Sequence, residues 1–301
     1  MTESAVSIER KRELFHAISG SSGGMSIVAN DGRESFRMIL RTAGRPHDDQ
    51  AISRVKRLIA TELGGTSSAM LVDTVYGRAA LSALVAAVPH RGRIIAVDRF
   101  IEEHLGPLTD TDLDLGAFDS FGDGAAAAKL YLHWRPEESP ERRARLSRAF
   151  VDGCAQRGVL SVLEGVVHIP DPAQVAGYLV RAAAEFGAFA PDLYKTQLPT
   201  FGMGSDAEIR HISEEISEAV EVPWLVLSNG VTADRFPSAV AAACDGGASG
   251  FLAGRGVWRD AVSAEPGSGA FARARARLQQ LAAIVDQHAR PWHRTAAWAL
   301  R

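Results

Sequence analysis

The residue with the clearest chemical potential is Lys195, which lies inside the apolar run Leu193–Gln197. Lysines are rarely buried unless they are paired. A desolvated lysine amine beside another cation becomes a nucleophile that can form a Schiff base with a carbonyl group. Lys129, which opens another apolar run, could supply that cation. We therefore predict a Schiff-base nucleophile at Lys195; the alternative is a lysine that points outward between helices or pairs with a carboxylate of the core.

Two carboxylates are candidates for proton transfer beside these lysines. Glu164 ends one apolar run, and Asp31 directly follows another. A carboxyl group in a partly apolar pocket can act as a general acid or base near neutral pH. Either carboxylate could instead be a structural partner of Lys195 or Lys129, and the two interpretations are compatible.

Two short polar segments near the end of the chain could bind phosphate. Ser228, Asn229 and Gly230 follow one apolar run, and Gly254 and Arg255 follow the next. Glycine lets backbone N–H groups approach phosphate oxygens, and an arginine can hold those oxygens with two hydrogen bonds. Each segment alone is typical of a turn. Together, at the ends of two consecutive expected strands, they predict a phosphate site.

The apolar runs that carry these residues form a regular series. Eight of them alternate with helical patterns at an average spacing of roughly 30 residues, which is typical of βα units. The alternation predicts a (β/α)8 TIM barrel of the α/β class, whose active site lies at the C-terminal ends of the strands. A doubly wound open sheet is the main alternative, but no glycine-rich dinucleotide turn follows the first run. The expected strands are Ser26–Asn30, Ala69–Val72, Ile94–Asp98, Lys129–Trp134, Leu160–Glu164, Leu193–Gln197, Trp224–Ser228 and Gly250–Ala253.

We expect a single domain over residues 1–301, with the barrel at about 26–262 and a helical tail at 263–301. The N-terminal extension holds a helical stretch, Ser7–Ile18, that we expect to close the bottom of the barrel. Amphipathic patterns predict further helices at Ser139–Arg157, Pro172–Phe186, Asp206–Val220 and Gly269–His288.

Composition excludes several classes of function. The chain carries 33 Lys plus Arg against 36 Asp plus Glu, and this net charge of −3 gives no electrostatic reason to expect nucleic acid as a partner. Neither a signal peptide nor a membrane span of ~18 apolar residues occurs, so we expect a cytoplasmic protein. Cys154 and Cys244 are expected to be buried thiols. His133 and His168 are predicted to be loop or lining residues, because the histidines lack metal-ligand spacing; neither a metal nor a cofactor is predicted.

Taken in order, these segments resemble the class I tagatose-1,6-bisphosphate aldolases and the closely related sulfofructosephosphate aldolases. The likeness runs from the first expected strand to the end of the eighth and covers most of the chain. Seven short motifs carry it: Asn30-Asp31-Gly32-Arg33, Val72-Asp73-Thr74-Val75-Tyr76-Gly77, Lys129-Leu130-Tyr131-Leu132, Leu163-Glu164, Leu193-Tyr194-Lys195, Leu227-Ser228-Asn229-Gly230-Val231 and Ala253-Gly254-Arg255.

The resemblance implies a Schiff base on Lys195 and proton transfer by Glu164, with Lys129 and Asp31 as its polar neighbours. The polar ends of the last two strands would hold the substrate phosphate. The implied reaction is metal-independent cleavage of a phosphorylated ketose, such as 6-deoxy-6-sulfofructose 1-phosphate or tagatose 1,6-bisphosphate, to dihydroxyacetone phosphate and an aldehyde. Barrels of this kind often pair, so a homo-oligomer is expected.

Two departures from the family pattern concern the far end of the substrate. Gly32 stands where the family usually has glutamine, and this removes an amide donor from the mouth of the barrel. His133-Trp134-Arg135 replaces a more Tyr-Asp-like segment, so Arg135 or Arg33 could bind a phosphate or sulfonate there.

Two other functions stay open. One is an aldolase for another phosphorylated sugar or deoxy sugar, and the other is a catalytically silent barrel that binds a sugar phosphate and regulates a partner. The presence of both lysines together with a carboxylate argues against a silent barrel, because an activated lysine needs such neighbours.

Overall fold

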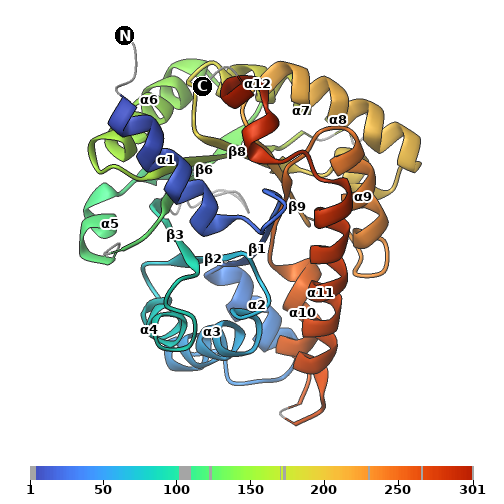
Figure 1. Cartoon of the computed structure of the whole chain (residues 1–301). Coiled ribbons are helices and arrows are strands. Elements are labelled where there is room, and N and C mark those ends of the chain that lie inside the picture. The colour runs from blue at the N-terminus through green and yellow to red at the C-terminus, as the bar shows by residue number, and fades with distance from the viewer. Residues whose placement is uncertain are drawn as a thin grey trace.

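The computed structural model describes residues 5–101, 110–121, 124–169, 171, 174–229, 231–265 and 267–299. Eight parallel strands close into a barrel, and helices lie around its outside (Figure 1). The predicted (β/α)8 barrel is therefore confirmed. The barrel strands are β1 (Met25–Asn30), β2 (Ala69–Asp73), β3 (Gly92–Ala96), β6 (Ala127–Trp134), β7 (Leu160–Val167), β8 (Leu193–Gln197), β9 (Trp224–Leu227) and β10 (Gly250–Ala253).

All eight expected strands overlap an observed strand of the barrel. Strands of a parallel barrel are buried on both faces, so they stand out in a sequence as nearly continuous apolar runs. Their order around the ring follows the chain, and β10 closes the ring against β1. The register places Glu164 on β7 opposite Tyr131 on β6 and opposite Lys195 on β8.

The C-terminal ends of two strands differ from the prediction by more than one residue. The third strand ends at Ala96, and Asp98 instead begins β4 (Asp98–Ile101), which pairs antiparallel with β5 (Asp110–Leu113) outside the barrel. The fifth strand continues past Glu164 to Val167, because its ladder with β6 extends as far as Trp134. Glu164 therefore lies within a strand, deeper in the barrel than the predicted strand end.

The helices have recognisable starts in the sequence. The hydroxyl oxygens of Ser139 and Ser205 accept hydrogen bonds from the backbone N–H groups of Glu141 (3.4 Å) and Glu208 (3.2 Å), which caps α6 and α8. The helix predicted at Asp206–Val220 is found with those bounds. The helices are α1 (Ala5–Ile18), α2 (Glu34–Thr42), α3 (Asp49–Leu63), α4 (Arg78–Ala87), α5 (Leu115–Phe121), α6 (Pro140–Gln156), α7 (Val175–Gly187), α8 (Asp206–Val220), α9 (Phe236–Asp245), α10 (Arg255–Ser263), α11 (Ala270–His288) and α12 (Ala296–Ala299), with 3-10 turns at Pro199–Gly202 and Trp292–Arg294.

The interior of the barrel is apolar near the N-terminal ends of the strands and polar near the C-terminal ends. Side chains along a strand alternate between its two faces. On β7 and β8 the inward-facing Val162 and Leu193 belong to the lower apolar layer, and the next inward residues are Glu164 and Lys195. The polar site therefore stands on a packed apolar floor.

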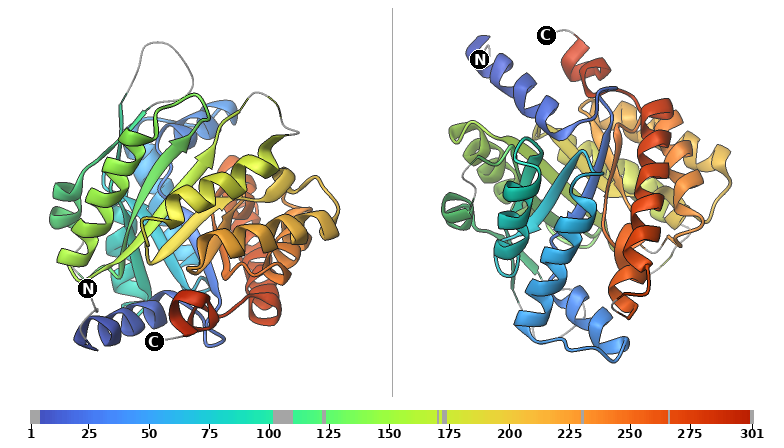
Figure 2. Two further views of the ribbon diagram at one scale, coloured as in Figure 1. Left: turned by 90° about the horizontal axis from the view of Figure 1, so that it is seen from above. Right: turned by 60° about the horizontal axis from the view of Figure 1, so that its bottom comes forward.

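Helix α1 seals this floor from below, as predicted. Its Phe15 is fully buried and stacks on Trp292, with ring centroids 4.7 Å apart. Leu14 and Ile18 belong to the same cluster as the apolar interior of the barrel. Both views of Figure 2 show α1 and the C-terminal α12 at the same end of the barrel.

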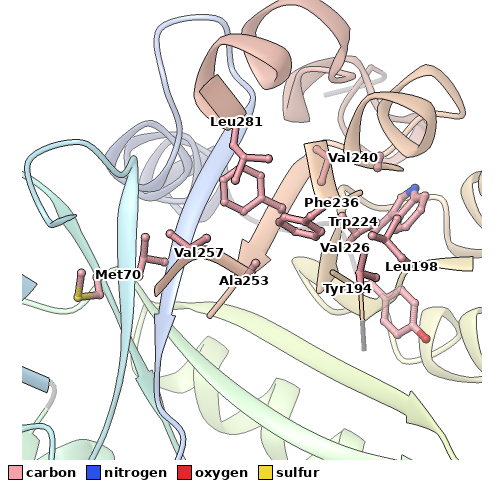
Figure 3. Packing of buried hydrophobic residues seen from close by; sticks show 14 of the residues in the cluster. Met70, Tyr194, Leu198, Trp224, Val226, Phe236, Val240, Ala253, Val257 and Leu281 are labelled. Atoms are coloured by element: carbon pink, nitrogen blue, oxygen red, sulfur yellow. The ribbon is translucent and has the colours of Figure 1, made fainter. Parts of the chain in front are cut away.

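A second core joins the barrel to its helices. Outward-facing Val226 of β9 and Ala253 of β10 belong to one buried cluster with Phe236 and Val240 of α9 and Val257 of α10 (Figure 3). Burial of such surface at about 25 cal/mol per Å² fixes the helices against the strands. The position of α10, whose first residue is Arg255, is thereby set by packing on the outside of the barrel.

Two smaller expectations also concern the described part of the chain. Cys154 and Cys244 are both buried free thiols, as predicted. In the part of the chain that the structure describes, no helix combines the length and the apolar character needed to span a bilayer.

Candidate active site

A cavity of about 870 Å³ opens at the C-terminal ends of the barrel strands. Side chains from β1, β6, β7 and β8 and from the segments after β9 and β10 line it, as expected for the catalytic end of a TIM barrel. Gly230 lies outside the described residues. Of the other residues that the sequence predicted for the site, all but Arg135 line this cavity: Asp31, Arg33, Lys129, Glu164, Lys195, Ser228, Asn229, Gly254 and Arg255.

Two lysines share the carboxylate of Glu164 at the floor of the cavity. Lys195 Nζ lies 2.9 Å from Glu164 Oε1, and Lys129 Nζ lies 3.3 Å from Oε2. All three side chains are buried. Glu164 can thus serve both as a structural partner and in proton transfer, because its carboxylate contacts the predicted nucleophile Lys195 and the predicted cation Lys129.

Lys129 is held by three carboxylates. Its Nζ lies 2.7 Å from Asp31 Oδ2 and 2.7 Å from Asp98 Oδ1, in addition to the contact with Glu164. Burial alone would lower the pKa of Lys129, but the charges of Asp31, Asp98 and Glu164 raise that pKa well above its usual value. Lys129 is therefore a fixed cation at the centre of the site. The sequence marked Asp98 only as a strand end.

Asp31 shows the opposite shift. Burial would raise the pKa of Asp31, but the nearby ammonium groups of Lys129 and Lys195 hold the pKa far below its usual range. A carboxylate whose pKa is depressed on folding stabilises the native state above its unfolded pKa of about 3.9, and this stabilisation is lost as the pH falls through the folded value.

Asp31→Asn is accordingly expected to flatten the loss of stability in acid. Below about pH 4, Asp31 of the wild type binds a proton in the unfolded chain but not in the folded chain. The free energy of unfolding therefore decreases as the pH is lowered. Urea unfolding curves at a series of pH values between about 2 and 6 would measure the slope. An unchanged slope in Asp31→Asn would contradict the charge assignment at this residue.

A third buried lysine, Lys56 of α3, was missed by sequence reasoning. Its Nζ forms an ion pair with Asp73 and donates a hydrogen bond to the backbone oxygen of Asn30 at 2.7 Å. Asp73 Oδ1 accepts hydrogen bonds from the N–H groups of Val75 (2.9 Å) and Tyr76 (2.7 Å), which orders the segment after β2. Lys56 therefore supports one wall of the cavity from behind, and a lysine within a helix gives no signal of such a role.

Arg33 lies between the Lys56–Asp73 pair and the carboxylates around Lys129. Its guanidinium donates a hydrogen bond to the backbone oxygen of Asp98 at 2.8 Å, and it lies 3.5 Å from the carboxylate of the same residue. Its Cζ lies 5.0 Å from the ring centroid of Phe100 on β4. Arg33 is thus enclosed by protein groups on several sides.

The far side of the cavity, at β9 and β10, carries a cation that is suited to an anion. Arg255 Nη2 donates to the amide oxygen of Asn229 at 2.9 Å, and among the described residues no carboxylate forms an ion pair with this guanidinium. Arg255 is the first residue of α10, so the positive end of the helix dipole adds to its charge. Ser228 Oγ accepts a hydrogen bond from Gly256 N at 3.1 Å, which joins the two segments.

Close packing accounts for glycine at two positions of the mouth. A Cβ atom on Gly32 would come within 2.3 Å of Ser35 Oγ, and one on Gly254 would come within 2.8 Å of the backbone oxygen of Ala29. A side chain at position 32 would therefore require Ser35 to move. Arg135, which the sequence offered as an anion ligand, pairs with Glu138 and is not among the residues that line the cavity.

An aromatic and imidazole cluster covers the β6 and β7 side of the cavity. Tyr131 Oη lies 3.3 Å from His133 Nδ1 and 3.2 Å from His168 Nε2, and the two imidazole rings are 4.7 Å apart. All three side chains line the cavity, as expected for His133 and His168. Over the described ranges, no group of three or more His, Cys, Asp or Glu side chains is arranged to hold a metal ion.

Comparison with known proteins agrees with this geometry. Residues 26–260 match the model of the DeoC/LacD family aldolases. A curated relative from Enterococcus faecalis, tagatose 1,6-diphosphate aldolase 2, is 25% identical over 94% of this chain and 96% of its own length. Another, tagatose 1,6-diphosphate aldolase from Staphylococcus haemolyticus, is 27% identical over 84% of this chain and 86% of its own.

A solved structure shares the fold. It is described as a Schiff base-forming fructose-1,6-bisphosphate aldolase and superposes with a TM-score of 0.58, covering 92% of this chain and 99% of that one. The sequence identity is 17%, so this likeness supports the architecture of the barrel alone.

Proposed function

Because this chain belongs to the DeoC/LacD family of aldolases, we propose that it cleaves a phosphorylated ketose through a Schiff base on Lys195. The chain is a lyase. The products would be dihydroxyacetone phosphate and an aldehyde. The observation that carries the proposal is the shared carboxylate of Glu164, with Lys195 on one oxygen and the fixed cation Lys129 near the other.

The different carboxylate contacts of Lys129 and Lys195 support the different roles that we propose for them. Among the described residues, Lys129 contacts three carboxylates, whereas Lys195 contacts Glu164 alone. Lys129 therefore keeps its proton, and Lys195 is the amine that can pass a proton to Glu164. The neutral Lys195 amine attacks the C2 carbonyl of the ketose to give a carbinolamine. The proton held by Glu164 then passes to the departing hydroxyl group, and loss of water leaves an iminium ion and the Glu164 carboxylate.

Cleavage of the C3–C4 bond follows from this iminium ion. Glu164, or a water molecule that it holds, removes the proton of the C4 hydroxyl group. The C4 carbonyl forms, the C3–C4 bond breaks, and its electron pair moves into the iminium to give an enamine. After the aldehyde leaves, a proton returns to C3 and water hydrolyses the iminium, which releases dihydroxyacetone phosphate and restores Lys195.

Arg255, Ser228 and the start of α10 are suited to hold the phosphate on C1. A charge-assisted hydrogen bond contributes about 1.5–3 kcal/mol. Arg255→Ala is therefore expected to raise KM for the phosphorylated ketose by about 10- to 100-fold, with a smaller effect on kcat. Arg273→Ala, on the outer helix α11, is the matched control and should leave KM unchanged. An unchanged KM in Arg255→Ala would remove this residue from the phosphate site.

A product assay tests the proposed reaction. The enzyme is incubated with tagatose 1,6-bisphosphate, fructose 1,6-bisphosphate, tagatose 1-phosphate and 6-deoxy-6-sulfofructose 1-phosphate, and dihydroxyacetone phosphate is reduced by a coupled, NADH-dependent enzyme. We expect release from at least one substrate, with no loss of rate in EDTA. Absence of release from all four, or activity that EDTA abolishes, would contradict the proposal. A rise in melting temperature with a sugar phosphate but without cleavage would favour the silent regulatory barrel.

Three further expectations belong with this proposal. We propose that residues 1–301 form one domain, that the protein works in the cytoplasm, and that it forms a homo-oligomer. Limited proteolysis, localisation of a tagged protein and light scattering would test them in turn.

A further inference from the structure

The position of Lys195 separates two chemically different ends of the cavity. In the order around the barrel, β8 has β9 and β10 on one side and β7 and β6 on the other. Arg255 and Ser228 lie on the first side, whereas Tyr131 and His168 lie on the second. A ketose joined to Lys195 at C2, with its phosphate toward Arg255, extends its remaining carbons toward Tyr131 and His168.

Tyr131 borders the reacting centre, and His168 stands above it toward the mouth. Tyr131 is opposite Glu164 in the strand register, and Lys129 Nζ lies 5.8 Å from the centroid of its ring. Tyr131 follows Lys129 by two residues on the same face of β6, and His168 follows Glu164 by four residues on the same side of β7. At about 3.3 Å per residue, His168 lies roughly 13 Å further toward the mouth than Glu164, and the Tyr131 hydroxyl reaches toward it, 3.2 Å from His168 Nε2. The aldehyde half of a ketose occupies this space when C2 is bound below.

The hydrogen bonds among Tyr131, His133 and His168 indicate that these side chains are uncharged. The Tyr131 hydroxyl has one proton but faces an imidazole nitrogen at 3.3 Å and another at 3.2 Å, so it donates to one ring and accepts from the other. Burial raises the pKa of Tyr131, and burial together with His133 and Arg135 lowers the pKa of His168 to about 4. A neutral phenol and a neutral imidazole therefore face the substrate at neutral pH.

The cations near this end are engaged elsewhere within the described part of the chain. Arg33 donates to the backbone oxygen of Asp98 at 2.8 Å, and its side chain is only 13% exposed. Arg99, whose side chain is 64% exposed, lies 2.6 Å from a carboxylate oxygen of Asp112, and Arg135 pairs with Glu138. An anionic group beside Tyr131 and His168 would have to compete with the carboxylates that already pair with these cations, which weakens its binding.

We propose that Tyr131 and His168 form the subsite for the aldehyde half of the substrate, and that this subsite selects an uncharged, hydroxyl-bearing chain over one that ends in phosphate or sulfonate. The inference rests on the proposed function and narrows it to ketose 1-phosphates with a free C6 hydroxyl. A hydroxyl group both donates and accepts, as the phenol and the imidazole do, whereas a phosphate dianion only accepts.

Matched substrates test this selection. Tagatose 1-phosphate is compared with tagatose 1,6-bisphosphate, and fructose 1-phosphate with fructose 1,6-bisphosphate, so that the stereochemistry at C4 is the same within each pair. We expect kcat/KM to be at least tenfold higher for the monophosphate of the pair that is cleaved. A higher value for the bisphosphate, or for 6-deoxy-6-sulfofructose 1-phosphate, would overturn the inference.

Substitutions at His168 test whether this side chain causes the preference for an uncharged substrate chain. His168→Leu is expected to lower kcat/KM for the monophosphate by about 10- to 100-fold, because a substrate hydroxyl loses its partner. His168→Gln, which keeps an uncharged hydrogen-bonding group, should retain most of the activity, and His168→Arg should shift the preference toward the bisphosphate. His211→Leu, on the exposed face of α8, is the control and should change nothing.

Borohydride trapping of dihydroxyacetone phosphate separates this inference from the proposed function. Dihydroxyacetone phosphate lacks the aldehyde half, so His168→Leu should form the reduced adduct as readily as the wild type. Failure of the wild type to form an adduct would reject the Schiff base itself. Normal trapping in the wild type with equal losses of trapping and cleavage in His168→Leu would show a structural role and overturn the subsite.

Discussion

Lys195→Arg is expected to lower kcat by at least about 10⁴-fold, which corresponds to about 5.5 kcal/mol of transition-state stabilisation. The guanidinium keeps a positive charge beside Glu164, so the buried ion pair is preserved, but it cannot form an iminium ion with a ketone. Steady-state release of dihydroxyacetone phosphate measures the loss. Because one residue carries the covalent chemistry, no neighbouring group replaces it.

Folding and binding must be intact for this result to be informative. Circular dichroism and the melting temperature of Lys195→Arg should remain close to those of the wild type, and the variant should still bind inorganic phosphate at the Arg255 side of the cavity. Retention of more than about 1% of the wild-type kcat would place the nucleophile elsewhere, since it leaves under 3 kcal/mol for Schiff-base formation at this lysine.

Lys129→Met is expected to cause the largest loss of stability in the site. Lys129 is buried and contacts Asp31, Asp98 and Glu164. Removal of one partner from a buried ion cluster leaves the remaining charges uncompensated and costs about 3–5 kcal/mol. Urea unfolding measures the change in the free energy of unfolding. Lys11→Met is the matched control, because Lys11 is a more exposed lysine 3.0 Å from Asp192 and should lose less than about 1 kcal/mol.

The pH dependence of this loss has a definite sign. The pKa of Lys129 is raised on folding, so its stabilisation is present below its unfolded pKa of about 10.4 and is lost as the pH rises through the folded value. The difference between wild type and Lys129→Met should therefore stay constant from about pH 5 to 9 and shrink above about 10.4. If Lys129→Met does not fold, the double variant with Asp98→Asn should recover part of the stability. A loss below about 1 kcal/mol would contradict the central position of this cation.

Much of the fold could be predicted because barrel strands have a simple physical signature. Parallel strands that are buried on both faces read as short apolar runs, and Lys195 stood out because an ammonium group interrupts such a run. The same reasoning located Glu164 and Lys129. What the sequence did not provide was their arrangement: Glu164 lies between the two lysines, and that placement depends on the register of β6, β7 and β8.

The missed elements lack such a signature. Lys56 occupies an ordinary helical position, and its partner Asp73 is brought to it only by the packing of α3 against the barrel. The β4–β5 pairing was missed because Asp98 continues the apolar run of the third strand without a turn signal. Tyr131 and His168 are far apart in sequence, and their contact arises because the fifth strand runs on to Val167, beyond its predicted end, with His168 directly after it.

The most direct test of the Schiff base is the position of a reduced adduct. The chain has only four lysines, Lys11, Lys56, Lys129 and Lys195, so peptide mapping after borohydride reduction gives an unambiguous answer. With dihydroxyacetone phosphate or a cleaved ketose 1-phosphate, the account predicts one adduct per chain, on the peptide that contains Lys195. An adduct on any of the other three lysines, or turnover without an adduct, would contradict it.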